Sequence, residues 1–78
     1  MILEFIIRGN PKRVRVSSVR KLERIVGNLI IATGQPCGYE WELTDEGGKV
    51  LDQKLPPSGH SLRNGDRVFL SLKPGQAA

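Results

Sequence analysis

The sequence predicts an α+β domain in which one main helix covers one face of a mixed β-sheet. Three observations lead to this fold class: two strand-like segments around a turn at the start, an amphipathic stretch in the middle, and an alternating segment near the end. A chain of 78 residues is long enough for one domain with one small core. We expect that domain to span residues 1–73 and a flexible tail to span residues 74–78.

The chain opens with a predicted β-hairpin. Residues 2–7 are rich in β-branched and aromatic side chains, and residues 12–16 alternate between charged and apolar side chains. Between the two segments, Gly9 and Asn10 can adopt a positive φ and form the turn. The alternation predicts that the inward-facing side chains are Leu3, Phe5, Ile7, Val14 and Val16.

An amphipathic helix is predicted from roughly Ser18 to Thr33. Its apolar stripe recurs at three- and four-residue spacings and comprises Val19, Leu22, Val26, Leu29 and Ile30. Ser17 or Ser18 is placed to cap the start of the helix, and Gly34 to end it in a left-handed conformation. Gly27 costs about 1 kcal/mol relative to alanine inside a helix, which indicates close packing or a frayed last turn.

Two further strands and a short return strand complete the expected sheet. Residues 39–44 alternate, with Tyr39, Trp41 and Leu43 facing inward, and a turn at residues 45–48 leads to a short strand at residues 49–51 that places Leu51 in the core. Residues 67–72 form the last strand, with Val68 and Leu70 inward. A hairpin followed by a right-handed crossover places the last strand beside the first, so the pattern predicts a five-stranded β-grasp sheet.

Composition and isolated reactive side chains argue against an enzyme. Cys37 is the only cysteine, so neither an internal disulfide nor a paired-cysteine metal site can form, and no activating base accompanies it. His60 has no orienting neighbour in the sequence and is interpreted as a surface residue. Asp45, Glu46 and Asp52 lack the spacing of a calcium loop and are better explained as acceptors in turns. We expect no cofactor and no bound metal.

The net charge of +4 leaves nucleic acid as a weak candidate partner. Twelve basic residues face eight acidic ones, and the basic residues are mostly scattered, which is typical of a solvated surface. Single-stranded nucleic acid would require aromatic side chains on the basic face, where only Phe69 qualifies. No signal-like leader and no apolar run long enough to span a bilayer are present, so we expect a cytoplasmic protein that does not bind membranes.

Two apolar side chains are predicted to share the sheet face that the helix leaves open. Ile6 and Phe69 both point away from the helix by strand alternation, and the strands that carry them are expected to be neighbours. Charged residues, among them Arg15 and Arg67, should surround the pair. A small protein-binding patch and scattered apolar exposure both explain this arrangement.

The last strand runs directly into Lys73, Pro74 and Gly75, and then into Gln76 and two alanines. Glycine has no Cβ, so its carbonyl can enter a narrow channel that excludes bulkier residues. Such a terminus fits a small protein whose own C-terminal end is the substrate of other enzymes. A disordered end without a role explains the same residues.

Two segments of the chain resemble ubiquitin-like proteins. They are the block Trp41-Glu-Leu-Thr-Asp-Glu-Gly-Gly-Lys-Val-Leu-Asp52 and the segment Phe69-Leu-Ser-Leu-Lys-Pro-Gly75. Within that superfamily the chain resembles the small bacterial proteins of the multiubiquitin type, which occur beside conjugation enzymes. The resemblance implies an E1-like adenylating enzyme that activates the terminal glycine, an E2-like conjugating enzyme, a processing or deconjugating peptidase, and target proteins.

In this resemblance, Gly75 is the residue to be conjugated and Gln76 the first residue to be removed. Leu72, Lys73 and Pro74 would contact the enzymes. The family typically ends in a pair of glycines, whereas here Gly75 stands alone before Gln76-Ala-Ala78. Either a peptidase removes those three residues, or this protein is not conjugated. The remaining alternatives are an interaction or self-assembly module that is not conjugated, and a sulfur carrier that acts through a terminal thiocarboxylate.

Overall fold

The protein folds as a four-stranded mixed sheet with one α-helix across one face. The computed structural model describes residues 1–36 and 38–73. The elements in chain order are β1 (Ile2–Ile7), β2 (Asn10–Arg15), α1 (Leu22–Ala32), β3 (Trp41–Asp45), the short 3₁₀ helix η1 (Pro57–His60) and β4 (Arg67–Leu72). The strand order is β2-β1-β4-β3, in which the central pair β1 and β4 is parallel and the outer pairs are antiparallel. This arrangement is consistent with a β-grasp fold.

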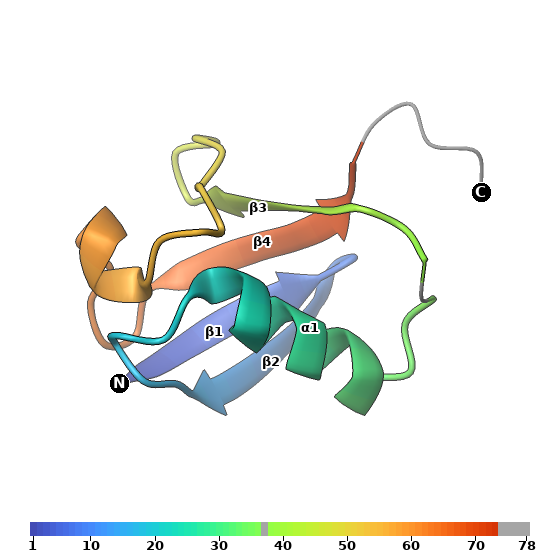
Figure 1. Cartoon of the computed structure of the whole chain (residues 1–78), viewed down its shortest axis with the longest axis horizontal. Helices are drawn as coiled ribbons and strands as arrows, with labels where there is room; N and C mark the ends of the chain where they lie inside the picture. Colours follow the sequence, from blue (N-terminus) through green and yellow to red (C-terminus); the bar gives the residue numbers. More distant parts are fainter. Residues whose placement is uncertain (37, 74–78) are drawn as a thin grey trace.

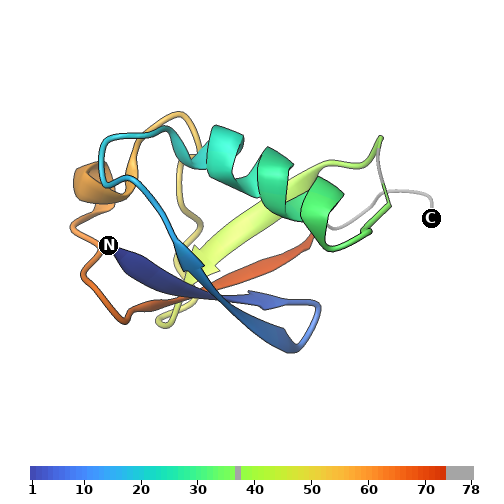
Figure 2. The same cartoon turned by 90° about the horizontal axis from the view of Figure 1, so that it is seen from below.

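The core lies between α1 and the sheet face above which it runs (Figures 1 and 2). The predicted inward side chains within β1, β3 and β4 are buried, as are Val16 and Leu51. Tyr39 was also predicted to face inward, but it precedes β3, which begins at Trp41, and it is only partly buried. The helix contributes Ile25, which the predicted stripe omitted, together with the expected buried residues Leu22, Val26, Leu29 and Ile30. Val14 was predicted to be in the core, but it is only partly buried because β2 is an edge strand.

The hairpin turn lies one residue earlier than predicted. Ile7 pairs with Asn10, so the loop consists of Arg8 and Gly9 alone, with φ values of 50° and 88°. Two positive φ values are the requirement of a two-residue type I′ turn, whose twist matches that of the strands it joins. Asn10 therefore begins β2, which places Pro11 within an edge strand, where a missing N–H is tolerated.

The helix begins at Leu22, later than predicted, and neither serine caps it. Residues 17–20 form a turn in which the Arg20 N–H bonds to the Ser17 carbonyl at 3.3 Å. The first free N–H groups of α1 are instead satisfied by a distant segment: Leu22 donates to the Leu55 carbonyl at 3.0 Å, and Glu23 donates to the Gln53 carbonyl at 2.9 Å. Val19, predicted on the apolar stripe, lies before the helix and is 77% exposed.

The last helical residue is Ala32, and Gly34 terminates the helix in a left-handed conformation as predicted. Gly34 has a φ of 69°, and its N–H donates to the Ile31 carbonyl while the Gln35 N–H donates to the Ile30 carbonyl. These two bonds are the pair that defines a Schellman motif. Gly27, by contrast, is exposed on the middle of the helix, and a Cβ added there would meet nothing within 4 Å. The predicted close packing at Gly27 and the alternative of a frayed last turn are both wrong.

The predicted fifth strand at residues 49–51 is absent from the described residues. The segment makes only an isolated bridge between Thr44 and Val50. Leu51 then turns into the core, and the Asp52 carboxylate accepts the Lys54 N–H at 2.9 Å, which starts a turn. On either side of this bridge the Asp45 N–H donates to the Lys49 carbonyl at 3.0 Å and the Leu51 N–H donates to the Leu43 carbonyl at 2.8 Å, so the segment stays bonded to β3 without forming a regular strand.

Candidate functional site

The strand register assembles an apolar row across the face of the sheet opposite α1. Ile6 lies directly opposite Phe69 in the parallel pair β1–β4. Pro11 on β2 is the partner of Ile6, and Thr44 on β3 is the partner of Phe69. We call these four residues, Pro11, Ile6, Phe69 and Thr44, the apolar row. Figure 2 shows that the helix lies on the other side of the sheet, so no described element covers this row.

Phe69 is an exposed large apolar side chain in the apolar row. Its side chain is 37% exposed, and Ile6 beside it is half-buried. An open hollow of about 500 Å³ adjoins the pair and is lined by the β1–β2 turn and the acidic turn after β3, including Arg8, Asp45 and Glu46. Large apolar side chains next to a polar rim are typical of a protein-binding surface.

A row of charged side chains runs parallel to the apolar row. Glu4 lies on β1 between Arg13 on β2 and Arg67 on β4. A Glu4 carboxylate oxygen is 2.9 Å from Arg67 Nε, and the other is 3.7 Å from Arg13 Nε. Arg67, predicted as part of the patch, is therefore held beside Phe69 by this ion pair.

Arg15 is the one predicted patch residue that the register separates from the others. It lies opposite Ile2, at the far end of β1 from Ile6. Ile2 and Ile6 are four positions apart on β1, a distance of about 13 Å at the rise of an extended strand. The predicted patch thus consists of Ile6, Phe69 and Arg67, with Arg15 outside it.

Pro11 and Thr44 belong to the row but were not predicted from the sequence. Their positions depend on the register between neighbouring strands, and placing Asn10 in the turn shifted the expected pairing of β2. The sequence held a usable signal, because a two-residue loop at Arg8 and Gly9 would have put Pro11 opposite Ile6.

The end of β4 is fixed to the segment before β3. The Lys73 N–H donates to the Glu40 carbonyl at 2.9 Å, and Lys73 Nζ is 3.4 Å from a Glu40 carboxylate oxygen. Leu72 is partly buried against the core, so much of its side chain serves the fold. The other predicted tail residues, Pro74, Gly75 and Gln76, lie outside the described residues, as does Cys37.

The remaining candidate side chains act within turns. The Asp45 carboxylate accepts the N–H groups of Gly47 and Lys49 at 2.9 and 3.0 Å, which confirms its role as a turn acceptor. His60 is half-buried, and its Nε2 lies 2.8 Å from the Asp52 carbonyl oxygen. No group of three potential metal ligands comes together in residues 1–36 and 38–73. Over the same residues, no helix has the length and apolar character needed to cross a membrane.

The fold and this face define the protein as a small α+β domain with an open sheet surface. The chain belongs to the family described as "Protein of Unknown function (DUF2604)", whose model matches residues 1–78. No curated protein sequence matches the chain.

Among solved structures, a chain in "Crystal structure of ATBAG1 in complex with HSP70" is similar to this protein, with a TM-score of 0.79 and 13% sequence identity. The match covers 96% of the present chain and 41% of the other, so the present chain spans about two fifths of the length of that one. At this identity the likeness concerns the fold alone, and the strand order and single helix described above are consistent with a β-grasp fold. In all, 204 chains of solved structures match this chain.

Proposed function

We propose that the protein is a ubiquitin-like modifier that binds its enzymes through the apolar row and is conjugated through Gly75. The observation that carries the proposal is the direct pairing of Ile6 with Phe69 on the open face of the two central strands. Burying these side chains against a partner removes apolar surface from water, at about 25 cal/mol per Å². The resemblance to the multiubiquitin type supports the same function.

The exit point of the C-terminal segment supports conjugation. The two contacts between Lys73 and Glu40 hold the end of β4 in place. Because β4 is parallel to β1, this end lies at the same end of the sheet as the β1–β2 turn (Figure 1), whose Arg8 and Gly9 line one part of the hollow beside Phe69. An enzyme bound over the apolar row is thus close to the point where the segment containing Gly75 begins.

In this proposal a peptidase first removes Gln76-Ala-Ala78, and an E1-like enzyme then activates the Gly75 carboxylate as an acyl-adenylate. A thiol of the E1-like enzyme then displaces AMP to form a thioester, and a thiol of the E2-like enzyme takes over the acyl group. An amine of a target protein finally displaces that thiol and forms the amide. Glycine is required next to the reacting carbon because a side chain would obstruct an extended segment in a narrow channel. Pro74 restricts φ and lowers the entropy lost when the segment enters that channel.

The decisive measurement is the intact mass of the protein recovered from its native cells, together with peptide mapping of its conjugates. We expect mature protein ending at Gly75 and branched peptides that carry Gly75 on a target lysine. Gly75→Ala should abolish both without changing the circular dichroism spectrum. If every molecule retains Gln76-Ala-Ala78 and no branched peptide is found, the protein is not a modifier.

The role of the apolar row is tested by the double variant Ile6→Glu/Phe69→Glu. A matched control is Val19→Glu/Ile31→Glu, which places the same charges at apolar side chains that are 77% and 74% exposed elsewhere on the surface. We expect the first variant to reduce conjugate yield at least about tenfold and the control to leave it unchanged. Equal yields from two folded variants would remove the apolar row from the proposal.

A second candidate function, a binding or self-assembly module that is not conjugated, rests on the same apolar row and needs no free glycine. Sedimentation velocity separates the two candidates. Loss of self-association in Ile6→Glu/Phe69→Glu, combined with an intact C terminus in native cells, favours the module over the modifier.

A further inference from the structure

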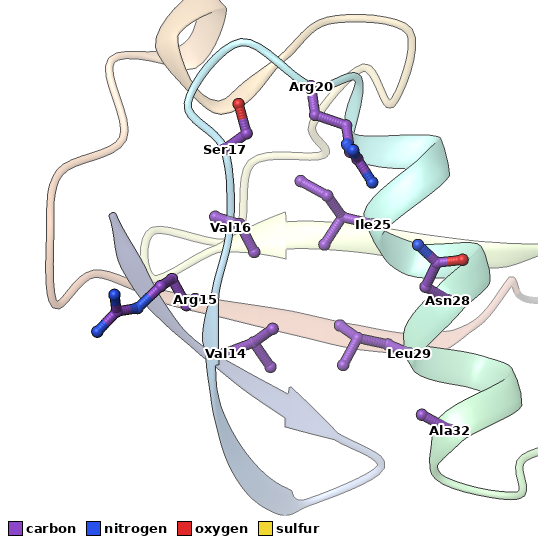
Figure 3. A pocket seen from close by; sticks show the side chains of 9 residues that line it. All are labelled: Val14, Arg15, Val16, Ser17, Arg20, Ile25, Asn28, Leu29 and Ala32. Carbon is purple, nitrogen blue, oxygen red and sulfur yellow. The ribbon is translucent and has the colours of Figure 1, made fainter.

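The exposed residues of α1 lie on two sides of the helix. Asn28 and Ala32 line a groove of about 410 Å³ between α1 and β2 (Figure 3). Arg24, Gly27 and Ile31 are also exposed, but they are not among the residues that line this groove. At 3.6 residues per turn these three residues lie within about 60° of one another, opposite the buried stripe of α1. We call Arg24, Gly27 and Ile31 the outer helix face.

The described fold does not require a glycine at position 27. Gly27 lies inside α1, its φ is not positive, and an added Cβ would meet nothing within 4 Å. A glycine at such a position costs about 1 kcal/mol relative to alanine. Residues that break a local preference without a compensating contact are expected at functional sites. The missing Cβ allows another backbone to approach α1 closely at this point.

Ile31 adds an apolar side chain to the outer helix face. It is 74% exposed and lies four residues after Gly27, so the two are neighbours along the helix surface. A second helix that crosses α1 at Gly27 can pack closely, because the distance between two helix axes depends on the side chains at the contact. Its apolar side chains would then remove Ile31 from water. A strand fits this surface less well, because the backbone groups inside a helix are already hydrogen-bonded.

Basic side chains gather at the start of α1. An open hollow of about 680 Å³ beside the first turn is lined by Arg20, Lys21 and Arg24, together with Val19 and Glu23. Among the described residues, none of these three basic side chains forms an ion pair. The first N–H groups of α1 are already bonded to the segment after β3, so the side chains provide the positive charge. Because the helix dipole is also positive at this end, acidic groups of a partner would relieve the repulsion.

A second copy of this chain fits the outer helix face poorly. In an antiparallel pair of helices centred on Gly27, Ile31 of one copy would face Glu23 of the other, because both residues lie four positions from Gly27. In a parallel pair, Arg24 would face Arg24 of the other copy. The first arrangement places a carboxylate against an apolar side chain, and the second places two like charges together.

We propose that the outer helix face binds an acidic amphipathic helix of a partner protein. That helix crosses α1 at Gly27, covers Ile31 with an apolar side chain, and directs carboxylates towards Arg24 and the hollow beside it. The outer helix face lies on the other side of the sheet from the apolar row (Figure 2). Binding at this surface does not depend on conjugation.

The probe is a synthetic capped peptide of about 18 residues, because shorter isolated helices are marginal in water. It consists of alanine, leucine and glutamate, with the leucines in one helical stripe around a central alanine. A control peptide has the same composition but no leucine stripe. Binding is measured by isothermal titration calorimetry and by amide shifts of ¹⁵N-labelled protein. We expect saturable binding with the largest shifts at Arg24, Gly27 and Ile31, and at least about tenfold weaker binding of the control peptide.

Matched variants test the close approach at Gly27. Gly27→Leu places a side chain where the two helices would touch, whereas Ala32→Leu places the same side chain beside the groove that faces β2. We expect Gly27→Leu to weaken binding at least about tenfold and Ala32→Leu to leave it unchanged. Leucine favours helix more than glycine does, so Gly27→Leu should not lower the stability of the protein. Thermal denaturation thus separates a loss of binding from a loss of fold.

A second matched pair tests the apolar contact. Ile31→Gln removes apolar surface without adding a charge, and Val50→Gln makes the same kind of change at a side chain that is 59% exposed elsewhere. We expect about tenfold or greater weakening for Ile31→Gln and none for Val50→Gln.

The proposal is overturned if the first peptide does not shift the amides of α1, if both peptides bind equally, or if Gly27→Leu and Ala32→Leu behave alike. It is also overturned if single-stranded oligothymidylate shifts the same amides and the acidic peptide does not, because the surface would then recognise nucleic acid. If Gly27→Leu fails to fold by circular dichroism, Ile31→Gln and the control peptide decide the question.

Discussion

At the scale of single residues, Glu4 shows how a charged side chain can organise a surface without adding much stability. Its carboxylate lies between Arg67 and Arg13, whose side chains are 60% and 82% exposed. Ion pairs this accessible to solvent contribute about 0–1 kcal/mol. The consequence is positional: Glu4 keeps two arginines beside Ile6 and Phe69, where they can meet acidic groups of a partner.

The residue with the largest expected effect on stability is Trp41. Its side chain is 8% exposed, it begins β3, and it belongs to the buried cluster beneath α1. We expect Trp41→Ala to lower the free energy of unfolding by about 3–5 kcal/mol, because the cavity adds to the lost burial. A small domain has little reserve against such a loss. Chemical denaturation measures it, and a loss below about 1 kcal/mol would contradict the buried position.

At the scale of elements, the local sequence pattern was sufficient to predict the four strands of the sheet but not the residue at which the helix begins. Residues 67–72 and the inward faces of β1, β3 and β4 were predicted correctly, because strand alternation alone assigns them. The helix start depends on carbonyls at Gln53 and Leu55, which lie some thirty residues away in the chain. The predicted return strand is not formed either: residues 49–51 make a single bridge to β3, between Val50 and Thr44, with one backbone bond on each side of it.

The candidate site was also predictable from the sequence only in part: strand alternation was predicted correctly, and the register between strands was not. Strand alternation placed Ile6 and Phe69 on the open face, and the crossover made their strands neighbours. The register between β1 and β2 places Pro11 beside Ile6 and Arg15 away from it. Predicting that register would have required the exact length of the β1–β2 turn. The groove between β2 and α1, which is lined by Val14, Val16 and Leu29 among others, was not predicted from the sequence. Its existence depends on the distance between an edge strand and the helix, which no local sequence pattern specifies.

The helix itself offers a stabilising substitution at Gly27. Gly27 lies in the interior of α1, is exposed, and has open space where a Cβ would be added. We expect Gly27→Ala to raise the free energy of unfolding by about 1 kcal/mol, the difference in helix propensity between the two residues.

Gly34→Ala is the matched control for that substitution. Gly34 also has open space around it but a φ of 69°, so the alanine would be strained and should destabilise the protein. Thermal and urea denaturation of both variants give the comparison. Equal shifts in the same direction would contradict the backbone assignments at the two glycines.

At the scale of the whole molecule, residues 1–73 contain all of the described packing. The last described strand residue, Leu72, packs partly against the core, and Lys73 makes the final contacts with Glu40. We expect a chain that stops after Lys73 to have an unfolding free energy within about 0.5 kcal/mol of the full chain. A chain that stops after Leu70 loses the pairing of Leu72 with Trp41 and should be clearly less stable. Denaturation of both truncated proteins tests the expected domain boundary.

The central position of β4 has a consequence for how the protein is made. Among the four strands of the sheet, β1 is synthesised first and β4 last, and these two strands pair along the middle of the sheet. Such a pairing joins residues nearly a chain length apart, which slows folding relative to local contacts. Until β4 emerges, Leu3, Phe5 and Ile7 have only the hairpin and the helix to cover them. The nascent chain therefore passes through a stage in which the apolar edge of β1 is open to chaperones and to premature association.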